Sequence, residues 1–294
     1  EEAVLSGRLV DRTIRPLFDH RMRRDVQVVI TILSVDEEND PDFIALLTAS
    51  TALAVSSIPW NGPVAGVKLM KRAASDEIIV NPKNDEVAAG FELVAFVAGT
   101  EGAINMVELE GCEAQEVHAV KAFEVAQKEI TVLTKWQQEI VAQVGKKKEE
   151  VPLAAPDAAL TALVKEFLAP RLEKAVYVPH KGEREAMLAD LKGELNEFLI
   201  GKGIDATLLG LADRVFEDEL DAVVHRNVLA HNKRPDGRAL DQVRDLYAEV
   251  GLFTRTHGSA LFVRGNTQSL AVTTLGPPGA QQLVETIEFT GKKR

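Results

Sequence analysis

The stretch RTHGSALFVRGNTQSLAVTTLG, residues 255–276, has the pattern of a tight β-hairpin. An apolar run and a run rich in β-branched residues flank the dipeptide Gly265-Asn266. A two-residue hairpin turn needs residues that tolerate a positive φ, and glycine and asparagine do so. Upstream, the Pro-Asp-Gly turn signal at 235–237 precedes a further strand-like run at 245–253. The last part of the sequence therefore predicts a small antiparallel sheet.

The region before this sheet is predicted to be helical. GKKKEEVPLAAP at 145–156 is charged and contains proline, which is typical of a linker. Beyond it, apolar residues recur with helical spacing in three segments, near 157–169, 183–200 and 205–229. These apolar stripes predict core faces, so we expect a small all-helical domain without ligand geometry.

The first 145 residues mix strand-like and helical patterns. VQVVITILSVD at 26–36 is nearly continuous and β-branched, which predicts a strand covered on both faces. Asp40 or Asp42 can cap a helix that begins near Pro41 and ends at Pro59. The remaining apolar runs predict four short strands and one long helix, at 64–70, 77–80, 91–98, 103–109 and roughly 113–144.

The opening stretch, EEAVLSGRLVDRTIRPLF at 1–18, predicts a helix that ends at Pro16. Leu5 and Leu9 lie four residues apart on one face of this helix. A stripe of three arginines occupies another face: Arg8, Arg12 and Arg15.

Such a stripe can hold phosphates, because each guanidinium offers a bidentate pair of donors. A solvated face, partly paired with Asp11 and Glu2, is the alternative. The residues alone favour the solvated face.

The charge is unevenly distributed along the chain. The formal net charge of −11, taken as a sum, argues against a nucleic-acid partner. However, residues 1–24 hold six arginines against four acids, and residues 226–294 hold ten lysines or arginines against six acids. Two basic ends flank an acidic middle, which fits an anionic partner and ordinary surface variation equally well. No apolar run reaches the roughly 20 residues of a membrane span, so we expect no membrane partner.

Few residues suggest chemistry by themselves. The single cysteine, Cys112, excludes an internal disulfide; we expect a buried thiol and a cytoplasmic location. The six histidines lack metal-ligand spacing, and His257 is expected to form a structural hydrogen bond rather than to face a substrate. The acidic cluster at 36–42 could bind a divalent cation, but loop solvation is the favoured interpretation. No phosphate-loop motif is present, so the residues alone predict no reaction.

Several segments together resemble the polynucleotide phosphorylase family, also called the polyribonucleotide nucleotidyltransferases. They occur in the family's order and span nearly the whole chain: SGRLVDRTIRPLF at 6–18, NDPDFIALLTASTALAVSSIPWNGPVAG at 39–66, FVAGTEGAINMVE at 96–108, and RPDGR at 234–238 followed by the hairpin of 255–276. Thr13 stands where the family often has proline, which leaves the arginine spacing intact.

The resemblance implies an α/β (α+β) fold with RNase PH-like (ribosomal protein S5 domain 2-like) cores. It places an N-terminally incomplete first core at 1–145, an all-helical domain at 146–230 and the truncated start of a second core at 231–294. Members of the family form homotrimeric rings around an RNA channel. They shorten single-stranded RNA from its 3′ end with inorganic phosphate as co-substrate, and they release nucleoside diphosphates with the help of Mg²⁺ (or Mn²⁺).

The resemblance also implies partners and further modules. Full-length members usually add KH and OB-fold RNA-binding modules, act in mRNA degradation, and can join an RNA-degradation complex with an endoribonuclease and a helicase. The family's catalytic serine stretch, aspartate pair and lysine fall beyond Arg294. We therefore expect no catalytic or metal-binding residue within this chain, and no activity of the chain alone.

Five arginines are the candidates for RNA or phosphate contact once the resemblance is considered: Arg8, Arg12, Arg15, Arg255 and Arg264. Arg15 is the favoured one, and Arg12 has pairing with an acid as its alternative. A non-catalytic RNA-binding ring subunit of an exosome-like assembly is the alternative function. A single-core RNase PH relative is a third possibility, but the helical domain and the RPDGR segment argue against it.

Overall fold

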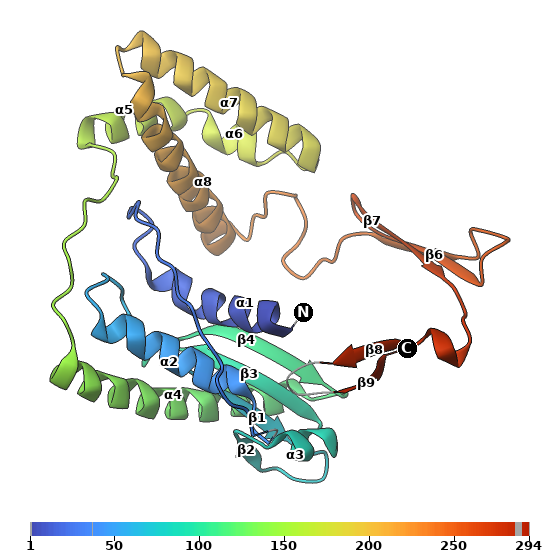
Figure 1. Ribbon diagram of the computed structural model, residues 1–294. Helices are drawn as coiled ribbons and strands as arrows, with labels where there is room; N and C mark the ends of the chain where they lie inside the picture. Colours follow the sequence, from blue (N-terminus) through green and yellow to red (C-terminus); the bar gives the residue numbers. More distant parts are fainter. Residues whose placement is uncertain (1, 37, 286–289, 294) are drawn as a thin grey trace. The chain divides into compact units, whose positions relative to one another are not determined.

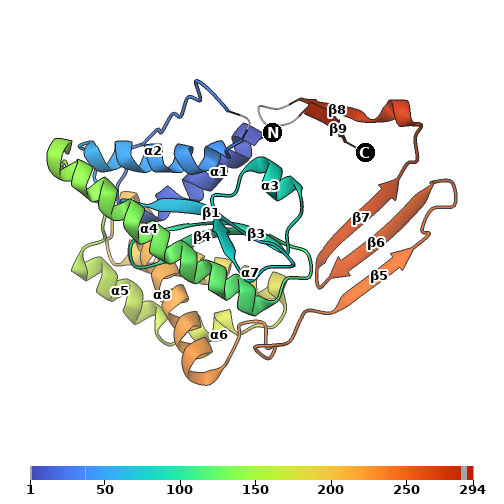
Figure 2. The ribbon, with the colours of Figure 1, turned by 90° about the horizontal axis from the view of Figure 1, so that it is seen from below.

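The computed structural model describes residues 2–36, 38–285 and 290–293. Its contacts divide the chain into two compact units. The first comprises Glu1–Leu153 with Gln282–Arg294, and the second comprises Ala154–Gln281. Helices and strands occur in both units, which confirms a mixed α/β chain (Figures 1 and 2). The predicted division at 145/146 and 230/231 stays a prediction.

The first unit is built on a four-stranded antiparallel sheet in the order β2-β1-β3-β4. Its strands follow the predicted ones closely: β1 (Ala65–Lys71), β2 (Ile78–Val80), β3 (Leu93–Gly99) and β4 (Ile104–Gly111). The short helix α3 (Asn84–Ala88), which the sequence did not predict, lies between β2 and β3.

Helices cover both faces of this sheet (Figure 1). On one face, α1 (Glu2–Ile14) and α2 (Pro41–Val55) pack against Phe96, Ala98 and Met106. On the other face, α4 (Glu116–Val144) packs against alternate residues of β1 and β3. β1 is covered on both faces, and its two lysines, Lys68 and Lys71, are each paired with a carboxylate.

Several predicted helix ends are confirmed. The side chain of Asp40 accepts from the backbone N–H of Asp42, so Asp40 is the N-cap of α2. The helix α1 passes into the 3₁₀ turn η1 (Arg15–Leu17) at Pro16. Of the two leucines on α1, Leu9 is buried and Leu5 is exposed.

The predicted strand at 26–36 is wrong, because this segment is extended but pairs with no strand in the described part of the chain. Its alternate residues Val26, Val28, Ile30 and Ile32 line a cleft. The residues between them face outward, and Leu33 is 92% exposed. A β-branched apolar run becomes a buried strand only where neighbours supply a hydrogen-bonding edge and a second covering layer, and the described residues supply cover on one side only.

The start of the predicted linker is fixed to the first unit. The ammonium of Lys148 donates to the carbonyl oxygens of Leu53, Ala54 and Ser56 at 2.9, 3.0 and 2.8 Å. These carbonyls lie at the C-terminal end of α2, where intrahelical donors run out, and the carbonyl of Leu53 also accepts from the N–H and hydroxyl of Ser56. Glu149 adds a 3.1 Å ion pair with Arg24. The remaining residues up to Asp157 contain no helix.

The second unit begins with the predicted helices, which are α5 (Ala158–Leu168), α7 (Lys181–Gly201) and α8 (Leu209–His231). The short helix α6 (Leu172–Val176) and the 3₁₀ turn η2 (Ala206–Leu208) complete this part. The side chain of Asp157 caps α5 by accepting from the backbone N–H of Leu160 at 2.7 Å. The apolar stripes meet in one core around Leu195, Leu199 and Phe216.

The opening hairpin is confirmed in the second unit. β6 (Gly258–Arg264) and β7 (Thr267–Thr273) pair antiparallel, and β5 (Leu246–Val250) pairs with the other edge of β6. Gly265 has a φ of 57°, the value that the first position of the turn requires.

After the 3₁₀ turn η3 (Pro278–Ala280), the chain returns to the first unit, where the strands β8 (Gln282–Glu285) and β9 (Thr290–Lys293) pair with each other. No helix in the described residues is long and apolar enough to cross a membrane.

Candidate functional site

The arginine-bearing helix α1 is held at its C-terminal end by two distant side chains. The indole Nε1 of Trp60 donates to the carbonyl oxygen of Ile14 at 3.1 Å. The amide Nδ2 of Asn105 donates to the carbonyl oxygen of Thr13 at 3.0 Å. Carbonyls in the last turn of a helix lack intrahelical donors, so these bonds fix where α1 ends. Sequence reasoning missed both residues as anchors of the helix.

The two anchors come from the segments that carry the family resemblance. Trp60 lies in 39–66 and Asn105 lies in 96–108. A third bond, from the backbone N–H of Asn61 to the carbonyl oxygen of Leu17, adds to them at 3.1 Å. Thr13 is fully buried, and its hydroxyl donates to the carbonyl oxygen of Leu9 within the helix at 2.9 Å. The resembling segments therefore have a physical role here, which is to position the arginine stripe.

The stripe itself faces solvent. Arg12 lies 3.5 Å from a carboxylate oxygen of Glu108 on β4, and 56% of its side chain is exposed. Arg15 donates from Nε and Nη2 to Asp11 at 2.9 and 2.8 Å, and 74% of its side chain is exposed. Arg8 is exposed and has no carboxylate partner in the described part of the chain. Exposed pairs of this kind contribute little to stability, so the cations stay accessible to other anions.

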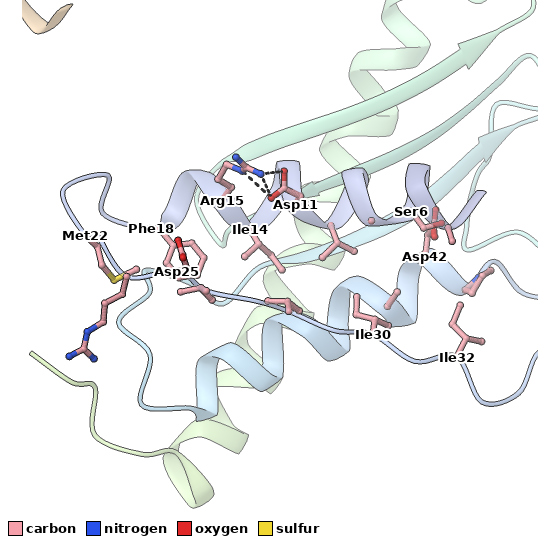
Figure 3. Close-up of a pocket in the computed structure, with 18 of the residues that line it drawn as sticks. Ser6, Asp11, Ile14, Arg15, Phe18, Met22, Asp25, Ile30, Ile32 and Asp42 are labelled. Atoms are coloured by element: carbon pink, nitrogen blue, oxygen red, sulfur yellow. Dashed lines mark hydrogen bonds and ion pairs between the residues drawn. The ribbon is translucent and has the colours of Figure 1, made fainter. Parts of the chain in front are cut away.

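The pairing alternatives raised from the sequence are present in the structure. Asp11 pairs with Arg15 one turn along the helix, and Glu108 pairs with Arg12. Figure 3 shows the Asp11–Arg15 pair on the side of α1 that faces away from α2. Contact of these arginines with RNA or phosphate stays a prediction.

A cleft of about 700 Å³ lies beside α1, between this helix, the extended segment and the start of α2 (Figure 3). Val26, Val28, Ile30 and Ile32 form an apolar wall. The carboxylates of Asp11, Asp25 and Asp42 also line the cleft. Asp19, Arg15 and Arg24 line it as well, so the cleft carries charges of both signs beside its apolar wall.

The carboxylate of Asp42 in this cleft has a raised pKa. Partial burial is the main cause, and the negative charges of Asp40 and Glu108 add to it. A hydrogen bond from Ser6 opposes the shift.

The acidic cluster at 36–42 is engaged with its own surroundings. Asp36 accepts hydrogen bonds from Asn39 and from the backbone N–H of Glu38, and these bonds lower its pKa. Asp40 pairs with Lys68 at 2.7 Å, and Glu38 pairs with Lys83. Glu37 lies outside the described residues. The described residues contain no group of three His, Cys, Asp or Glu side chains that could hold a metal ion.

The predicted residues of the second unit lie around its hairpin. Arg255 precedes β6 and Arg264 ends it, and both are exposed. The ring Nδ1 of His257 accepts from the backbone N–H of Leu275 at 2.9 Å, which confirms a structural hydrogen bond.

The prediction of a buried thiol at Cys112, in the first unit, is wrong, because this thiol is exposed. It follows Gly111, the last residue of β4, and so lies beyond the covered part of that strand.

The RPDGR segment forms a compact turn. Asp236 pairs with Arg238 at 2.6 Å and with Arg234 at 3.3 Å. Desolvation alone would raise the pKa of Asp236, but the hydrogen bonds from Arg238 and the two positive charges outweigh it and lower the pKa. Gly237 has a φ of 73°, which explains the glycine at this position. These arginines are therefore structural partners of Asp236.

Comparison with known proteins identifies the family. The chain is 38% identical over its whole length to the polyribonucleotide nucleotidyltransferase of Geobacillus kaustophilus, and 39% identical to that of Caldicellulosiruptor bescii. The enzyme of that name from Bacillus cereus is 37% identical over the whole chain. The chain belongs to the polyribonucleotide nucleotidyltransferase family.

The chain spans 40 to 41% of the length of these polyribonucleotide nucleotidyltransferases. A family model described as "Polyribonucleotide nucleotidyltransferase, RNA binding domain" matches residues 159–239. This match covers α6, α7 and α8, nearly all of α5, and the RPDGR turn. The match falls on the helical part of the second unit, where the sequence analysis predicted apolar core faces and no ligand site.

Proposed function

We propose that the chain is part of a polyribonucleotide nucleotidyltransferase that degrades mRNA from its 3′ end by phosphorolysis. In this reaction an oxygen of inorganic phosphate attacks the last phosphodiester of the RNA. The bond from phosphorus to the preceding 3′-oxygen breaks, that oxygen takes a proton, and a nucleoside diphosphate leaves. The whole-chain similarity to enzymes of this name supports the proposal. The alternative, a non-catalytic ring subunit, has no comparable support.

Within this proposal, the described residues bind RNA and do not cleave it. The family model for an RNA-binding domain supports RNA contact by 159–239. The exposed stripe of Arg8, Arg12 and Arg15 would hold the phosphate backbone, as bidentate donors suit phosphate oxygens. Arg255 and Arg264 would do the same in the second unit. We propose that the chain is inactive alone.

The rest of the proposal concerns the whole protein. Residues 1–145 and 231–294 would belong to two RNase PH-like cores joined by the helical domain of 146–230, in a homotrimeric ring that is part of an RNA-degradation complex. Mg²⁺ or Mn²⁺ would neutralise charge on the reacting phosphates. The described residues do not provide a ligand set for it. An exposed single thiol fits a reducing compartment, so we place the protein in the cytoplasm.

Phosphate-dependent release of nucleoside diphosphates from single-stranded RNA with Mg²⁺ tests the proposal. The full-length protein and the 294-residue chain are compared, each with and without phosphate. We expect release only from the full-length protein and only with phosphate. RNA binding without phosphorolysis by the full-length protein would instead support the scaffold alternative.

A further inference from the structure

We propose that Arg171 and Lys202, at one end of the helical part of the second unit, form a contact site for the phosphate backbone of single-stranded RNA. This inference rests on the proposed function, because it names the residues through which the helical part would bind RNA. Neither residue was a candidate on sequence grounds.

The two cations lie on an aromatic pair. The rings of Phe167 on α5 and Phe198 on α7 have centroids 5.0 Å apart. The guanidinium of Arg171 lies 4.3 Å from the Phe167 centroid, and the ammonium of Lys202 lies 5.5 Å from the Phe198 centroid. The pair of rings therefore carries a cation at each end. Lys202 follows the last turn of α7, where a positive charge is favourable, and Arg171 lies between the end of α5 and the start of α6.

The charges of both residues are available to an external anion. Arg171 and Lys202 are exposed, and no carboxylate in the described residues forms an ion pair with either. Arg171 uses Nη1 to donate to the carbonyl oxygen of Phe167 at 2.8 Å, which holds the guanidinium in place. Its remaining N–H donors can bind phosphate oxygens.

Two other cations of the same helices are neutralised by carboxylates. Lys165 on α5 pairs with Glu219 at 2.8 Å. Lys192 on α7 pairs with Asp213 at 3.3 Å. Arg171 and Lys202 therefore differ from Lys165 and Lys192, because no carboxylate in the described residues balances their positive charge.

The arrangement favours phosphates over bases as the bound groups. Phe167 is only 8% exposed, and the cations lie against the rings. A base cannot stack on the buried ring of Phe167, and Phe198 is only partly exposed, whereas a phosphate can approach the outward donors of both cations. Binding through phosphates alone does not depend on RNA sequence and weakens with salt. A purely structural role, as cations on aromatic rings, predicts a change in stability without any change in RNA binding.

The test measures binding of the natural full-length protein to a single-stranded homopolymeric RNA over a range of salt concentrations. The double variant R171Q/K202Q removes both charges. Losing two phosphate contacts is expected to reduce the slope of log affinity against log salt by about 1.4, and affinity at about 0.1 M salt by about 10- to 30-fold. The swap variant R171K/K202R keeps both charges and is expected to retain the slope.

The matched control is K165Q, which removes a paired lysine from the same helical part and should leave the slope unchanged. Thermal melting confirms that each variant is folded. An unchanged slope and affinity in a folded R171Q/K202Q protein would overturn this inference while leaving the proposed function intact. Absence of RNA binding by the unsubstituted protein would overturn both.

Discussion

The hydroxyl of Ser50 on α2 donates to the side-chain oxygen of Gln137 on α4 at 2.7 Å, and both residues are fully buried. The amide nitrogen of Gln137 donates to the carbonyl oxygen of Val64 at 2.8 Å, and the N–H of Val64 donates to the Ser50 hydroxyl at 2.9 Å. This closed ring joins two helices to the residue that precedes β1. These hydrogen bonds offset the cost of removing the polar groups from water, so the ring can lie in the core.

Substituting Gln137→Leu should destabilise the first unit by about 2–4 kcal/mol. The substitution leaves the carbonyl of Val64 and the hydroxyl of Ser50 buried with lost partners. Urea denaturation followed by circular dichroism measures the change. Gln143→Leu, at an exposed position of the same helix, is the control and should change the stability little. Equal stabilities of the two variants would contradict the structural role of the ring.

A second prediction concerns the pH dependence of stability. Glu92 accepts from Lys71, which is buried, and pairs with His118 at the start of α4. The hydrogen bonds from Lys71 and His118 lower the pKa of Glu92 below its usual value of 4.5. Because the folded-state pKa is the lower one, this stabilisation is present above about pH 4.5 and is lost as the pH falls through the folded-state pKa.

The free energy of unfolding should therefore fall more steeply below pH 4.5 in the unsubstituted protein than in the Glu92→Gln variant. The variant should also be less stable at pH 7, because the buried ammonium of Lys71 loses its carboxylate. Urea denaturation at several pH values measures both effects. Glu101→Gln, which alters an exposed pair with Lys135, should keep the parent pH profile. A parallel profile for Glu92→Gln would count against the assigned pKa shift.

A third prediction tests the arginine stripe. Arg15→Gln in the full-length protein should weaken binding of single-stranded RNA and reduce the salt slope by about 0.7, the value for one phosphate contact. Asp11→Asn is the matched control, because it removes the partner of Arg15 but keeps the cation. We expect this variant to bind RNA as well as the parent or better. Equal affinities for Arg15→Gln and the parent would exclude Arg15 as a contact.

A fourth prediction concerns the anchoring of α1. Trp60→Phe keeps an aromatic side chain but removes the five-membered ring of the indole with its Nε1 donor to Ile14, and should cost at least about 1–2 kcal/mol of stability. Trp136→Phe is the control, since this tryptophan is 47% exposed on α4. Urea denaturation measures both variants. If Trp60→Phe were no more destabilising than Trp136→Phe, the hydrogen bond to the end of α1 would make no measurable contribution to the free energy of unfolding.

A fifth prediction follows from the exposed thiol. Cys112 should react with a maleimide or an aromatic disulfide in the native protein, without denaturant. The reaction is followed by mass spectrometry, with Cys112→Ser as the blank. Reaction only after denaturation would show that the thiol is covered.

The local pattern of residues was sufficient for most elements of this chain. Asp40 and Asp157 mark helix starts through their own side chains. The glycine at 265 marks the hairpin turn through its backbone freedom. These signals depend on neighbours within a few residues, so they can be recognised without knowledge of the fold.

The failures share one feature, which is dependence on distant residues. The run at 26–36 has the composition of a buried strand. A buried strand also needs a neighbouring strand to pair with and a layer of residues over each face, and both must come from distant parts of the chain. Cysteine is usually a core residue, but whether Cys112 is exposed depends on how far the elements that cover the sheet extend.

The sequence by itself determined the long helices, most of the strands, the family and the positions of the arginines. Only the tertiary structure decided which side chains are covered and which charges are paired. Trp60 reaches the end of α1 across 46 residues, and Arg171 and Lys202 share one aromatic pair across 31 residues of chain. Local backbone preferences act over one or two turns, whereas burial and charge pairing depend on groups that folding brings together.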